Sequence, residues 1–375
     1  MLSAIDAFAP FVDRVRSAAA TGVPLRIRGG GSKDFYAQTL EGELLDTTAL
    51  AGIVSYEPSE LVVTAGAGTP LLELEALLAA HGQCLPFEPP YFGASGDAGS
   101  AATLGGMVAS GLSGPARASV GGVRDYMLGV KIINGKGEHL TFGGQVMKNV
   151  AGYDVSRLMA GSMGTLGLIT EVSLKVLPVA PLEATLRFEC SQAQALERLH
   201  AWGGQPLPLN ASCWVEDNGA GTLYLRLRGA VAAVEAACKT LGGERQDLLT
   251  TAADWQALRN QQLPWHQARS KTQDLWRLSL PQTTPALDLP DSPLIEWHGG
   301  LRWVRAGAEQ GSSLRAAAEA AGGHATLFIA CSASESYRNA RFDTLKPPLD
   351  RIHKALKHEF DPAGIFNPHR MSVHW

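Results

Sequence analysis

GSAATLGGMVASGLSG, residues 99–114, decides the fold together with two shorter glycine clusters, RGGGSK at residues 28–33 and GSMGTLG at residues 161–167. A glycine lets the backbone adopt positive φ and approach a ligand closely, so several N–H groups can converge on a pyrophosphate. Hydroxyl groups that would add donors are those of Ser32, Ser100, Thr103, Ser162 and Thr165. One cluster alone is best explained as a turn, but three favour a nucleotide-binding domain.

Neither of the two common phosphate-binding motifs is complete. The Rossmann fingerprint GxGxxG is met only in its first two glycines, Gly66 and Gly68. The Walker motif needs Ser or Thr after its lysine, and Asp34 follows Lys33. A pyrophosphate held by neither motif leaves a flavin dinucleotide as a candidate.

The segments around the clusters alternate between predicted strands and helices. Residues 23–28 predict a strand that runs into the first glycine turn, and residues 61–65 predict a second strand. The helix that follows is expected to be capped by Thr69 and to begin at Pro70. Alternation along residues 166–176 predicts a strand with one buried face.

Three further elements are predicted. Residues 130–142 indicate a hairpin around Asn134 and Gly135. A helix beginning near Thr103 would turn its N-terminal N–H groups towards a pyrophosphate. Residues 348–360 predict an amphipathic helix that stops before Pro362.

The composition indicates two domains. The chain has 375 residues and a formal net charge of −4, and chains of this length usually divide into two domains. Most of the 41 glycines precede residue 180, and all eight tryptophans follow residue 200. Pro178 and Pro181 favour an extended connector. We therefore place the first domain at residues 1–178 and the second at residues 182–345.

Composition also excludes several classes of function. With a pI near 6.2 the chain lacks the basic stripe that nucleic acid requires. The five cysteines form no CxxC pair, which favours a reduced, cytoplasmic compartment and no metal site. No stretch is long and apolar enough to span a bilayer, so no integral membrane segment is expected. Three tryptophans are expected in helices, packing in a core or an interface: Trp255, Trp265 and Trp276.

At this point the motifs show a resemblance to a known family. RGGGSKDFY, the 99–114 segment, GGVRDYMLGVKIINGKGE, KNVAGYDVSRLMAGSMGTLGLITEVSLKVLP and FDPAGIFNPHR agree in order and spacing. They resemble the vanillyl-alcohol-oxidase-like (PCMH-type) flavoproteins, and within that family the FAD-binding subunits of bacterial glycolate oxidases. The resemblance covers the first 180 residues densely and the last fifteen clearly.

The resemblance implies an α+β fold: a PCMH-type FAD-binding domain of two subdomains and a smaller α+β cap-like domain. A C-terminal helix and tail, residues 346–375, would return to the FAD domain. FAD is expected to bind non-covalently, because the first loop has no histidine and no cysteine lies between Cys84 and Cys190. The expected cofactor-binding residues are Arg28, Gly29, Gly30, Gly31, Ser32, Lys33, Gly99, Ser100, Thr103, Gly105, Gly106, Ala109, Gly111, Gly114, Arg124, Asp125, Gly161, Gly167, Ile169 and Asn367. Lys148 and Asn149 are further loop candidates, and an ordinary surface ion pair is the alternative for Arg124 and Asp125.

The catalytic residues are less well marked. Catalytically competent relatives carry an HGDGN-like stretch in the cap domain, where this chain reads EWHGGLRW at residues 296–303. His298 could serve as general base and Arg302 as carboxylate clamp. The alternative, which we favour, is a buried strand with a reduced active site.

The resemblance therefore implies the FAD-binding subunit of a glycolate oxidase or dehydrogenase complex that converts glycolate to glyoxylate. Its partners would be a catalytic flavoprotein subunit and an iron–sulfur subunit, and this chain would relay electrons or support assembly. Any contact with the inner membrane would be peripheral and through those partners. Two alternatives remain: a self-sufficient FAD-dependent 2-hydroxy-acid dehydrogenase, and a scaffold without flavin.

Overall fold

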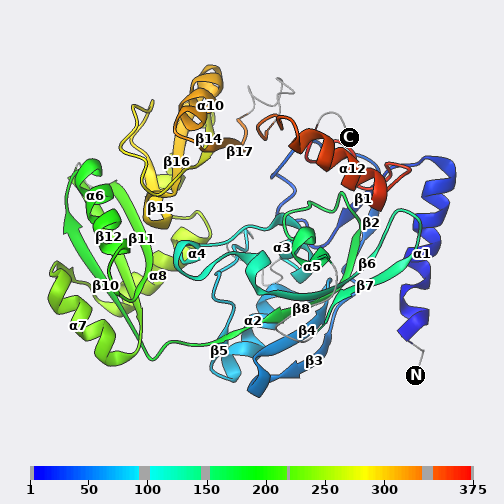
Figure 1. Ribbon diagram of the computed structural model, residues 1–375, viewed down its shortest axis with the longest axis horizontal. Coiled ribbons are helices and arrows are strands. Elements are labelled where there is room, and N and C mark those ends of the chain that lie inside the picture. Colours follow the sequence, from blue (N-terminus) through cyan, green and yellow to red (C-terminus); the bar gives the residue numbers. More distant parts are fainter. Residues whose placement is uncertain (1–3, 93–101, 145–152, 218–219, 332–340, 373–375) are drawn as a thin grey trace.

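The chain folds into two lobes, each built on its own β-sheet (Figure 1). The structure, a computed structural model, describes residues 4–92, 102–144, 153–217, 220–331 and 341–372. The chain passes between the lobes from β9 (Leu177–Pro178) to β10 (Leu182–Glu189). The α12 helix (Leu349–Phe360) brings the C-terminal segment back to the first lobe. Helices and sheets are mixed in both lobes, which confirms the predicted α+β class.

The first lobe is centred on a five-stranded antiparallel sheet. Its strand order is β3 (Ile53–Glu57), β4 (Val62–Gly66), β8 (Leu168–Lys175), β6 (Met127–Ile133) and β7 (His139–Gly143). Thr170 and Ser173 of β8 are buried together with its apolar residues. The prediction of only one buried face is therefore wrong, because Ile169 and Ser173, which point to the face opposite Val172 and Leu174, are buried as well.

Short strand pairs and several helices surround this sheet, in addition to α12. The parallel pair is β1 (Leu25–Arg28) with β2 (Glu43–Asp46), and β5 (Gln83–Cys84) pairs with β9. The helices are α1 (Ala4–Thr21), α2 (Leu71–Ala80), α3 (Leu104–Ser110), α4 (Arg117–Val120) and α5 (Val155–Met159). Pro70, not Thr69, is the N-cap of α2. The capping prediction is wrong because the Thr69 hydroxyl is engaged with the backbone of Gly52, 3.0 Å from its nitrogen.

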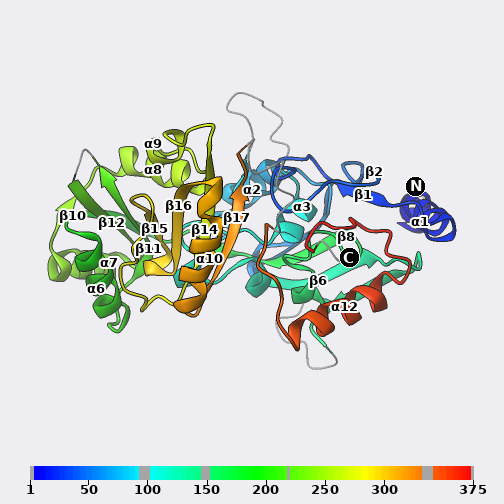
Figure 2. The same ribbon diagram turned by 90° about the horizontal axis from the view of Figure 1, so that it is seen from above.

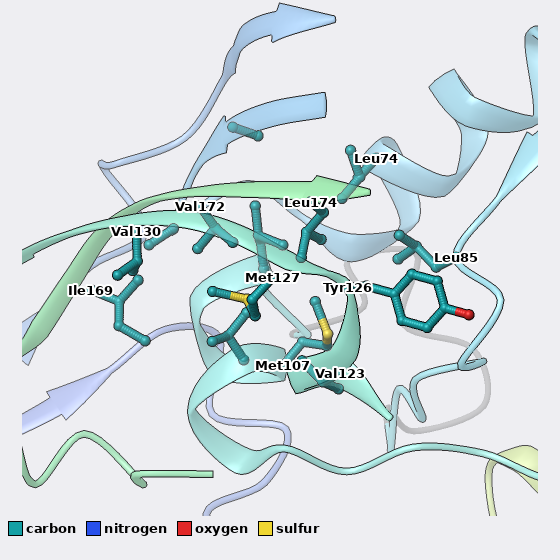
Figure 3. Close-up of a cluster of buried hydrophobic side chains, with 14 of the residues drawn as sticks. Leu74, Leu85, Met107, Val123, Tyr126, Met127, Val130, Ile169, Val172 and Leu174 are labelled. Atoms are coloured by element: carbon teal, nitrogen blue, oxygen red, sulfur yellow. The ribbon is translucent and has the colours of Figure 1, made fainter. Parts of the chain in front are cut away.

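A cluster of buried apolar side chains fixes α3 against the sheet. Figure 3 shows Met107 of α3 in one cluster with Met127 of β6 and Leu174 of β8. Thr103 caps α3 as predicted, accepting a hydrogen bond from the Gly106 nitrogen. The core therefore sets the position of the segment that follows the central glycine stretch.

The second lobe holds an eight-stranded sheet. Its strand order is β13 (Glu244–Arg245), β10, β12 (Ala220–Gly229), β11 (Leu209–Asp217), β15 (Leu294–Glu296), β16 (Leu301–Gly307), β14 (Gln273–Ser279) and β17 (His324–Ile329). Figure 2 shows α6 (Gln192–Gly203) and α7 (Val231–Leu241) on one side of its first strands, and α8 (Leu248–Arg259) and α9 (Pro264–Gln267) on the other. Helix α10 (Gly311–Ala320) packs on β17 and β14.

The tryptophan prediction for this lobe is partly wrong. Trp255 and Trp265 lie in α8 and α9, but Trp276 lies in β14. A short apolar run does not distinguish a strand from a buried helix by periodicity alone. All three indoles are buried, as expected of packing residues.

The C-terminal tail is bonded to the strand that leads into the first glycine loop. The Leu25 nitrogen donates to the Ile365 carbonyl at 2.7 Å, and the Asn367 nitrogen donates to the Leu25 carbonyl at 2.9 Å. The tail therefore closes one side of that loop, far from it in sequence.

Candidate FAD-binding site

A cleft in the first lobe gathers ten of the twenty predicted cofactor-binding residues. Its empty volume is about 550 Å³. The residues that line it are Ile27, Arg28, Gly29, Gly30, Gly31, Ser32, Lys33, Asp34, Leu40, Thr103, Gly106, Ala109, Ser110, Met163, Asn367 and Arg370. The first glycine loop, the start of α3 and the C-terminal tail thus converge, although they lie far apart in the sequence.

The backbone conformation explains why glycines occupy this loop. Gly31 has φ of 78°, a region that side chains disfavour, and a Cβ there would lie 2.1 Å from the Arg28 guanidinium. A Cβ on Gly29 would lie 2.2 Å from the Thr103 hydroxyl oxygen. Only residues without a side chain allow the loop to pass this close to Arg28 and α3.

The loop presents backbone donors to the cleft. The N–H groups of Gly30, Gly31 and Ser32 donate no hydrogen bond to any residue that the structure describes. Unpaired donors on consecutive residues form the kind of concavity that binds phosphate oxygens. This cradle fits the pyrophosphate of a dinucleotide.

Two cationic side chains flank the cradle. Arg28 donates from Nε to Asp34 at 2.7 Å, which fixes its guanidinium at the cleft. Lys33 Nζ lies 3.2 Å from the Ser32 hydroxyl. Burial, helped by repulsion from Arg259, lowers the pKa of Lys33 to about 8. A bound anion would oppose both effects and raise the pKa of Lys33.

Asn367 holds the cleft together. Its Oδ1 accepts from the Ile27 nitrogen and its Nδ2 donates to the Met163 carbonyl, both at 2.7 Å. Since both ends of the amide are occupied, Asn367 positions the walls of the cleft. Arg370 has a similar positioning role, because it donates hydrogen bonds to the carbonyls of Gln38 and Lys33.

Eight predicted residues in the described ranges lie outside the cleft lining, and five glycines and Ile169 are among them. Gly105 packs against Ala67, and Gly111 packs against Gly161 behind α3. Gly167 lies against the Ile133 carbonyl, and Ile169 lies in the hydrophobic core of the lobe (Figure 3). Gly114 faces the second lobe. These positions support the fold around the cleft.

Arg124 and Asp125 are also away from the cleft. Asp125 accepts from the Gly122 nitrogen at 2.8 Å and so caps a short turn, and Arg124 is 73% exposed. Their nitrogen and oxygen atoms are 3.9 Å apart, as in a weak surface pair. Four predicted residues lie outside the described ranges: Gly99, Ser100, Lys148 and Asn149.

A second pocket lies between the two lobes. It has an empty volume of about 350 Å³. Its lining residues are Pro90, Phe92, Leu112, Ser113, Gly114, Pro115, Leu258, Arg259, Gln261, Arg277, Glu296, Trp297, Leu301, Trp303 and Phe328. The end of α3 and the segment that follows it join the two sites, since Ala109 and Ser110 of α3 line the cleft whereas residues 112–115 line this inter-lobe pocket.

His298 bridges the lobes and does not line the inter-lobe pocket. Its Nε2 is 2.9 Å from the Ser119 hydroxyl, and its Nδ1 is 3.1 Å from the Ser212 hydroxyl. Burial lowers the pKa of His298 to about 4, so the ring is neutral at pH 7. With both nitrogens engaged, the structure gives it no place as a general base.

Arg302 lies on the opposite face of the sheet from the inter-lobe pocket. Its guanidinium donates to the carbonyls of Thr284 and Pro285, at 2.5 and 2.7 Å. Successive side chains of a strand point to opposite faces, and its neighbour Trp303 lines the pocket. The predicted role of carboxylate clamp therefore has no geometric basis.

The motif-based reasoning missed Arg277 and Glu296. In the register of the sheet, Arg277 is opposite Trp303 on the neighbouring strand, and Glu296 is opposite Leu301. All four line the inter-lobe pocket. The alternation of β14 around Trp276 and Leu278, which pack under α10, could have indicated that Arg277 points the other way.

Comparisons with known proteins also indicate an FAD-binding domain. Residues 11–143 match the family model of an FAD binding domain. The glycolate oxidase subunit GlcE of Escherichia coli (strain K12) is 45% identical over 371 residues, 99% of this chain and 99% of GlcE. The D-lactate dehydrogenase of Archaeoglobus fulgidus is 32% identical over 158 residues, 42% of this chain and 34% of that enzyme. The glycolate oxidase subunit GlcD of Bacillus subtilis is 30% identical over 166 residues, 44% of this chain and 34% of GlcD.

Among solved structures, an alkyldihydroxyacetonephosphate synthase superposes with a TM-score of 0.63 at 16% identity. The match covers 95% of this chain and 74% of that one. Together with the family match, it confirms the predicted fold of an FAD-binding domain with a second α+β domain. Within the described ranges, no helix combines the length and hydropathy needed to cross a bilayer.

Proposed function

Because the chain belongs to the family of the glycolate oxidase subunit GlcE, we propose that it is the FAD-binding subunit of a complex that oxidises glycolate to glyoxylate. The observation that carries this proposal is the glycine cradle, whose backbone donors at Gly30, Gly31 and Ser32 have no described protein partner. FAD is the cofactor of the family domain.

Bound FAD would supply a redox centre that can accept electrons passed on by a partner subunit. This chain's own residues bind and orient it. The cradle binds the pyrophosphate, and Arg28 and Lys33 offset its charge at the cleft. Asn367 holds the strand before the loop at a fixed distance from the Met163 turn.

We propose that the FAD is held without a covalent bond. Covalent flavin attachment uses a nucleophilic side chain, and among the described residues that line the cleft there is no histidine, cysteine or tyrosine. Dilution or denaturation in acid should therefore release the flavin intact.

The subunit relays electrons or supports assembly, and the oxidation of glycolate depends on a partner. Two partners are proposed: a catalytic flavoprotein subunit and an iron–sulfur subunit. GlcD of Bacillus subtilis, which is itself a glycolate oxidase subunit, shares 30% identity with this chain over 166 residues. The cysteines of this chain form no cluster-binding spacing, so an iron–sulfur centre would belong to another chain. All five lie in the described part as free thiols, which fits a cytoplasmic complex that reaches the inner membrane only through its partners.

The two alternatives have less support. A self-sufficient dehydrogenase would need a base and a clamp, but His298 bridges two serines and Arg302 binds backbone carbonyls. A scaffold without flavin would have no use for a loop that requires glycine at Gly31.

Reconstitution tests the proposal. The three subunits are assembled with and without this chain, and glycolate-dependent reduction of an artificial electron acceptor is measured. We expect full activity only with this chain present, and FAD in an amount that exceeds that of the catalytic subunit alone. Full activity and unchanged flavin content in its absence would refute the proposal.

A further inference from the structure

The second lobe contains a large cavity away from the FAD cleft. Helices α8 and α9 cover one face of the sheet (Figure 2), and the cavity lies between these helices and strands β10, β11, β12 and β16. Its empty volume is about 1150 Å³, part of which is open to solvent. We call it the second-lobe cavity. A concave site of this size with mostly apolar walls is typical of a small-molecule binding site.

Two tryptophan rings line the second-lobe cavity, and a hydrogen bond holds each of them in place. Trp255 donates from Nε1 to the Thr185 hydroxyl at 3.0 Å, and Trp265 donates from Nε1 to the Ser292 carbonyl at 3.2 Å. Tyr224 is a third aromatic residue of the lining. Since both indole N–H groups are occupied, the indoles offer apolar ring surface to a ligand.

An arginine lies over each indole. The guanidinium carbon of Arg226 is 4.8 Å from the ring centroid of Trp255, and that of Arg305 is 4.7 Å from the ring centroid of Trp265. Each arginine is in turn paired with a carboxylate. A ring that is bonded at its edge and stacked on a fixed guanidinium is restrained from turning into the empty space. The cavity is therefore preformed.

Anions are disfavoured in the second-lobe cavity. Glu216 and Asp254 line it at exposed positions, so two carboxylates lie at its mouth. The buried thiol of Cys213 lines it from the sheet. Burial raises the pKa of this thiol well above its usual value, and the charges of Glu296 and Asp254 raise it further. A ligand with a carboxylate or a phosphate would meet the same opposition.

Cations are disfavoured as well. Arg305 lines the cavity with a side chain that is 16% exposed. His266 lies next to the cavity, with its ring centroid 5.3 Å from that of Trp265. Burial, helped by repulsion from Arg305, lowers the pKa of His266 to about 3, so its imidazole is neutral at pH 7. Carboxylates at the mouth and an arginine in the wall together favour a ligand without net charge.

We propose that the second-lobe cavity binds a neutral planar ring compound, which packs against Trp255 and Trp265. A planar ring suits these walls, because aromatic pairs gain free energy beyond the area that they bury. The inference does not depend on the proposed function, since every lining residue belongs to the second lobe. Leu258 lines both this cavity and the inter-lobe pocket, so a bound ring would lie one side chain away from that pocket.

The test uses the full chain saturated with FAD, so that the FAD cleft is occupied. Three probes share a naphthalene ring and differ in charge at pH 7: 2-naphthol is neutral, 2-naphthoate is an anion and 2-naphthylmethylamine is a cation. Their binding is measured by calorimetry and by equilibrium dialysis. We expect saturable binding of 2-naphthol, at least about tenfold tighter than the binding of either charged probe.

Two variants fill the cavity from different walls. Ala268→Trp adds a ring at an exposed position of the lining, and Val215→Trp adds one from β11. We expect the affinity for 2-naphthol to fall at least about tenfold in each variant. Ala253→Trp is the matched control, because Ala253 is an exposed residue of α8 outside the lining. Thermal unfolding and FAD content are measured on every variant as a check of the fold.

Glu216→Gln tests the charge at the mouth of the cavity. The variant removes one carboxylate, so we expect the affinity for 2-naphthoate to rise by about two- to fivefold. The affinity for 2-naphthol should stay at the wild-type value, because a neutral ring does not sense the lost charge. A Glu216 that acted only on the shape of the mouth would change both affinities alike.

Three results would overturn the inference: 2-naphthol that fails to saturate, equal affinities for 2-naphthol and 2-naphthoate, or wild-type affinity for 2-naphthol in both filled variants. Each of them would leave the proposed function intact, because the FAD cleft belongs to the first lobe. A wild-type chain that fails to bind FAD would refute the proposed function instead.

Discussion

Trp297 donates its indole N–H to the carbonyl oxygen of Gly114 over 3.0 Å, and this buried hydrogen bond joins the second lobe to the segment that follows α3. Trp297 and His298 both have φ of 54°, which is uncommon for residues with side chains. Such a conformation is maintained only where surrounding contacts determine it. The inter-lobe pocket is therefore built around a fixed indole.

Trp297→Phe tests that hydrogen bond. The variant keeps an aromatic ring next to the guanidinium groups of Arg117 and Arg277. The buried Gly114 carbonyl, however, loses its hydrogen-bond donor. We expect the free energy of unfolding to fall by about 1–3 kcal/mol in urea denaturation. Trp202→Phe is the matched control, because the structure gives its indole no hydrogen bond and it is partly exposed. Equal stability of both variants would argue against the bond.

Gly31→Val tests the cradle. The valine would meet the Arg28 guanidinium and adopt a φ of 78°, so the loop must move out of its conformation. We expect FAD affinity, measured by flavin fluorescence, to fall at least about tenfold, which corresponds to about 1.4 kcal/mol. Gly203→Ala should leave it unchanged, because a Cβ at Gly203 meets no atom within 4 Å. An unaffected Gly31→Val would place the pyrophosphate elsewhere.

Glu88→Gln tests the ion pairs between the lobes. Glu88 accepts from Arg226 at 2.7 Å and from Arg228 at 3.3 Å, and both Glu88 and Arg226 are largely buried. Burial alone would raise the pKa of Glu88, but Arg226 and Arg228 together hold it below its usual value. Removing the charge leaves the buried guanidinium of Arg226 without its carboxylate partner. We expect the free energy of unfolding to fall by about 3 kcal/mol at pH 7.

The contribution of Glu88 to the free energy of unfolding should also depend on pH. A carboxyl with a lowered folded pKa contributes stability above its unfolded pKa, about 4.3, and loses it as the pH falls through the folded value. The difference between wild type and Glu88→Gln in urea should therefore shrink below about pH 4. A constant difference down to pH 3 would contradict the charge-based explanation. Glu244→Gln, at an exposed pair, serves as control.

His298→Asn tests the absence of a catalytic role. A general base contributes about 10²- to 10⁴-fold, so the loss of one would be conspicuous. We expect the glycolate turnover of the assembled complex to stay within about threefold of wild type. Stability should change in a defined way, because the unfolded histidine takes up a proton below about pH 6.5 whereas the folded ring resists it down to about pH 4.

Wild type should therefore lose stability as the pH falls from 6.5 towards 4, by at most about 1.4 kcal/mol per pH unit. His298→Asn should lack that part of the slope, and His200→Asn, at an exposed helix position, should keep it. A hundredfold loss of turnover in His298→Asn would contradict this prediction and support a role of His298 as a general base.

Local rules predicted the elements that build the cleft. Thr103 caps α3 because a hydroxyl before a helical run satisfies its first N–H groups. The strand before Gly29 ends at Arg28 because the glycine turn follows. The convergence of Asn367 on this loop could be expected only from the family resemblance, since 340 residues separate it from Ile27.

The inter-lobe pocket could not be predicted in the same way. Arg302 and His298 were candidates because they lie where relatives carry a catalytic motif. Side chains alternate along β16, however, so Arg302 points away from the pocket that its neighbour Trp303 lines. Arg277 lies in a short apolar run whose strand character periodicity did not reveal. Its place at the pocket depends on its pairing with Trp303 of β16, which is a property of the sheet.

One measurement tests the central claim, that this subunit binds FAD and depends on a partner to oxidise glycolate. The visible spectrum of the FAD-loaded chain is recorded without oxygen, before and after glycolate is added, and again after the partner subunits are added. We predict that the bound flavin stays oxidised with glycolate alone and bleaches only with the partners. Bleaching of the isolated chain by glycolate would contradict the claim and show that it oxidises the substrate itself.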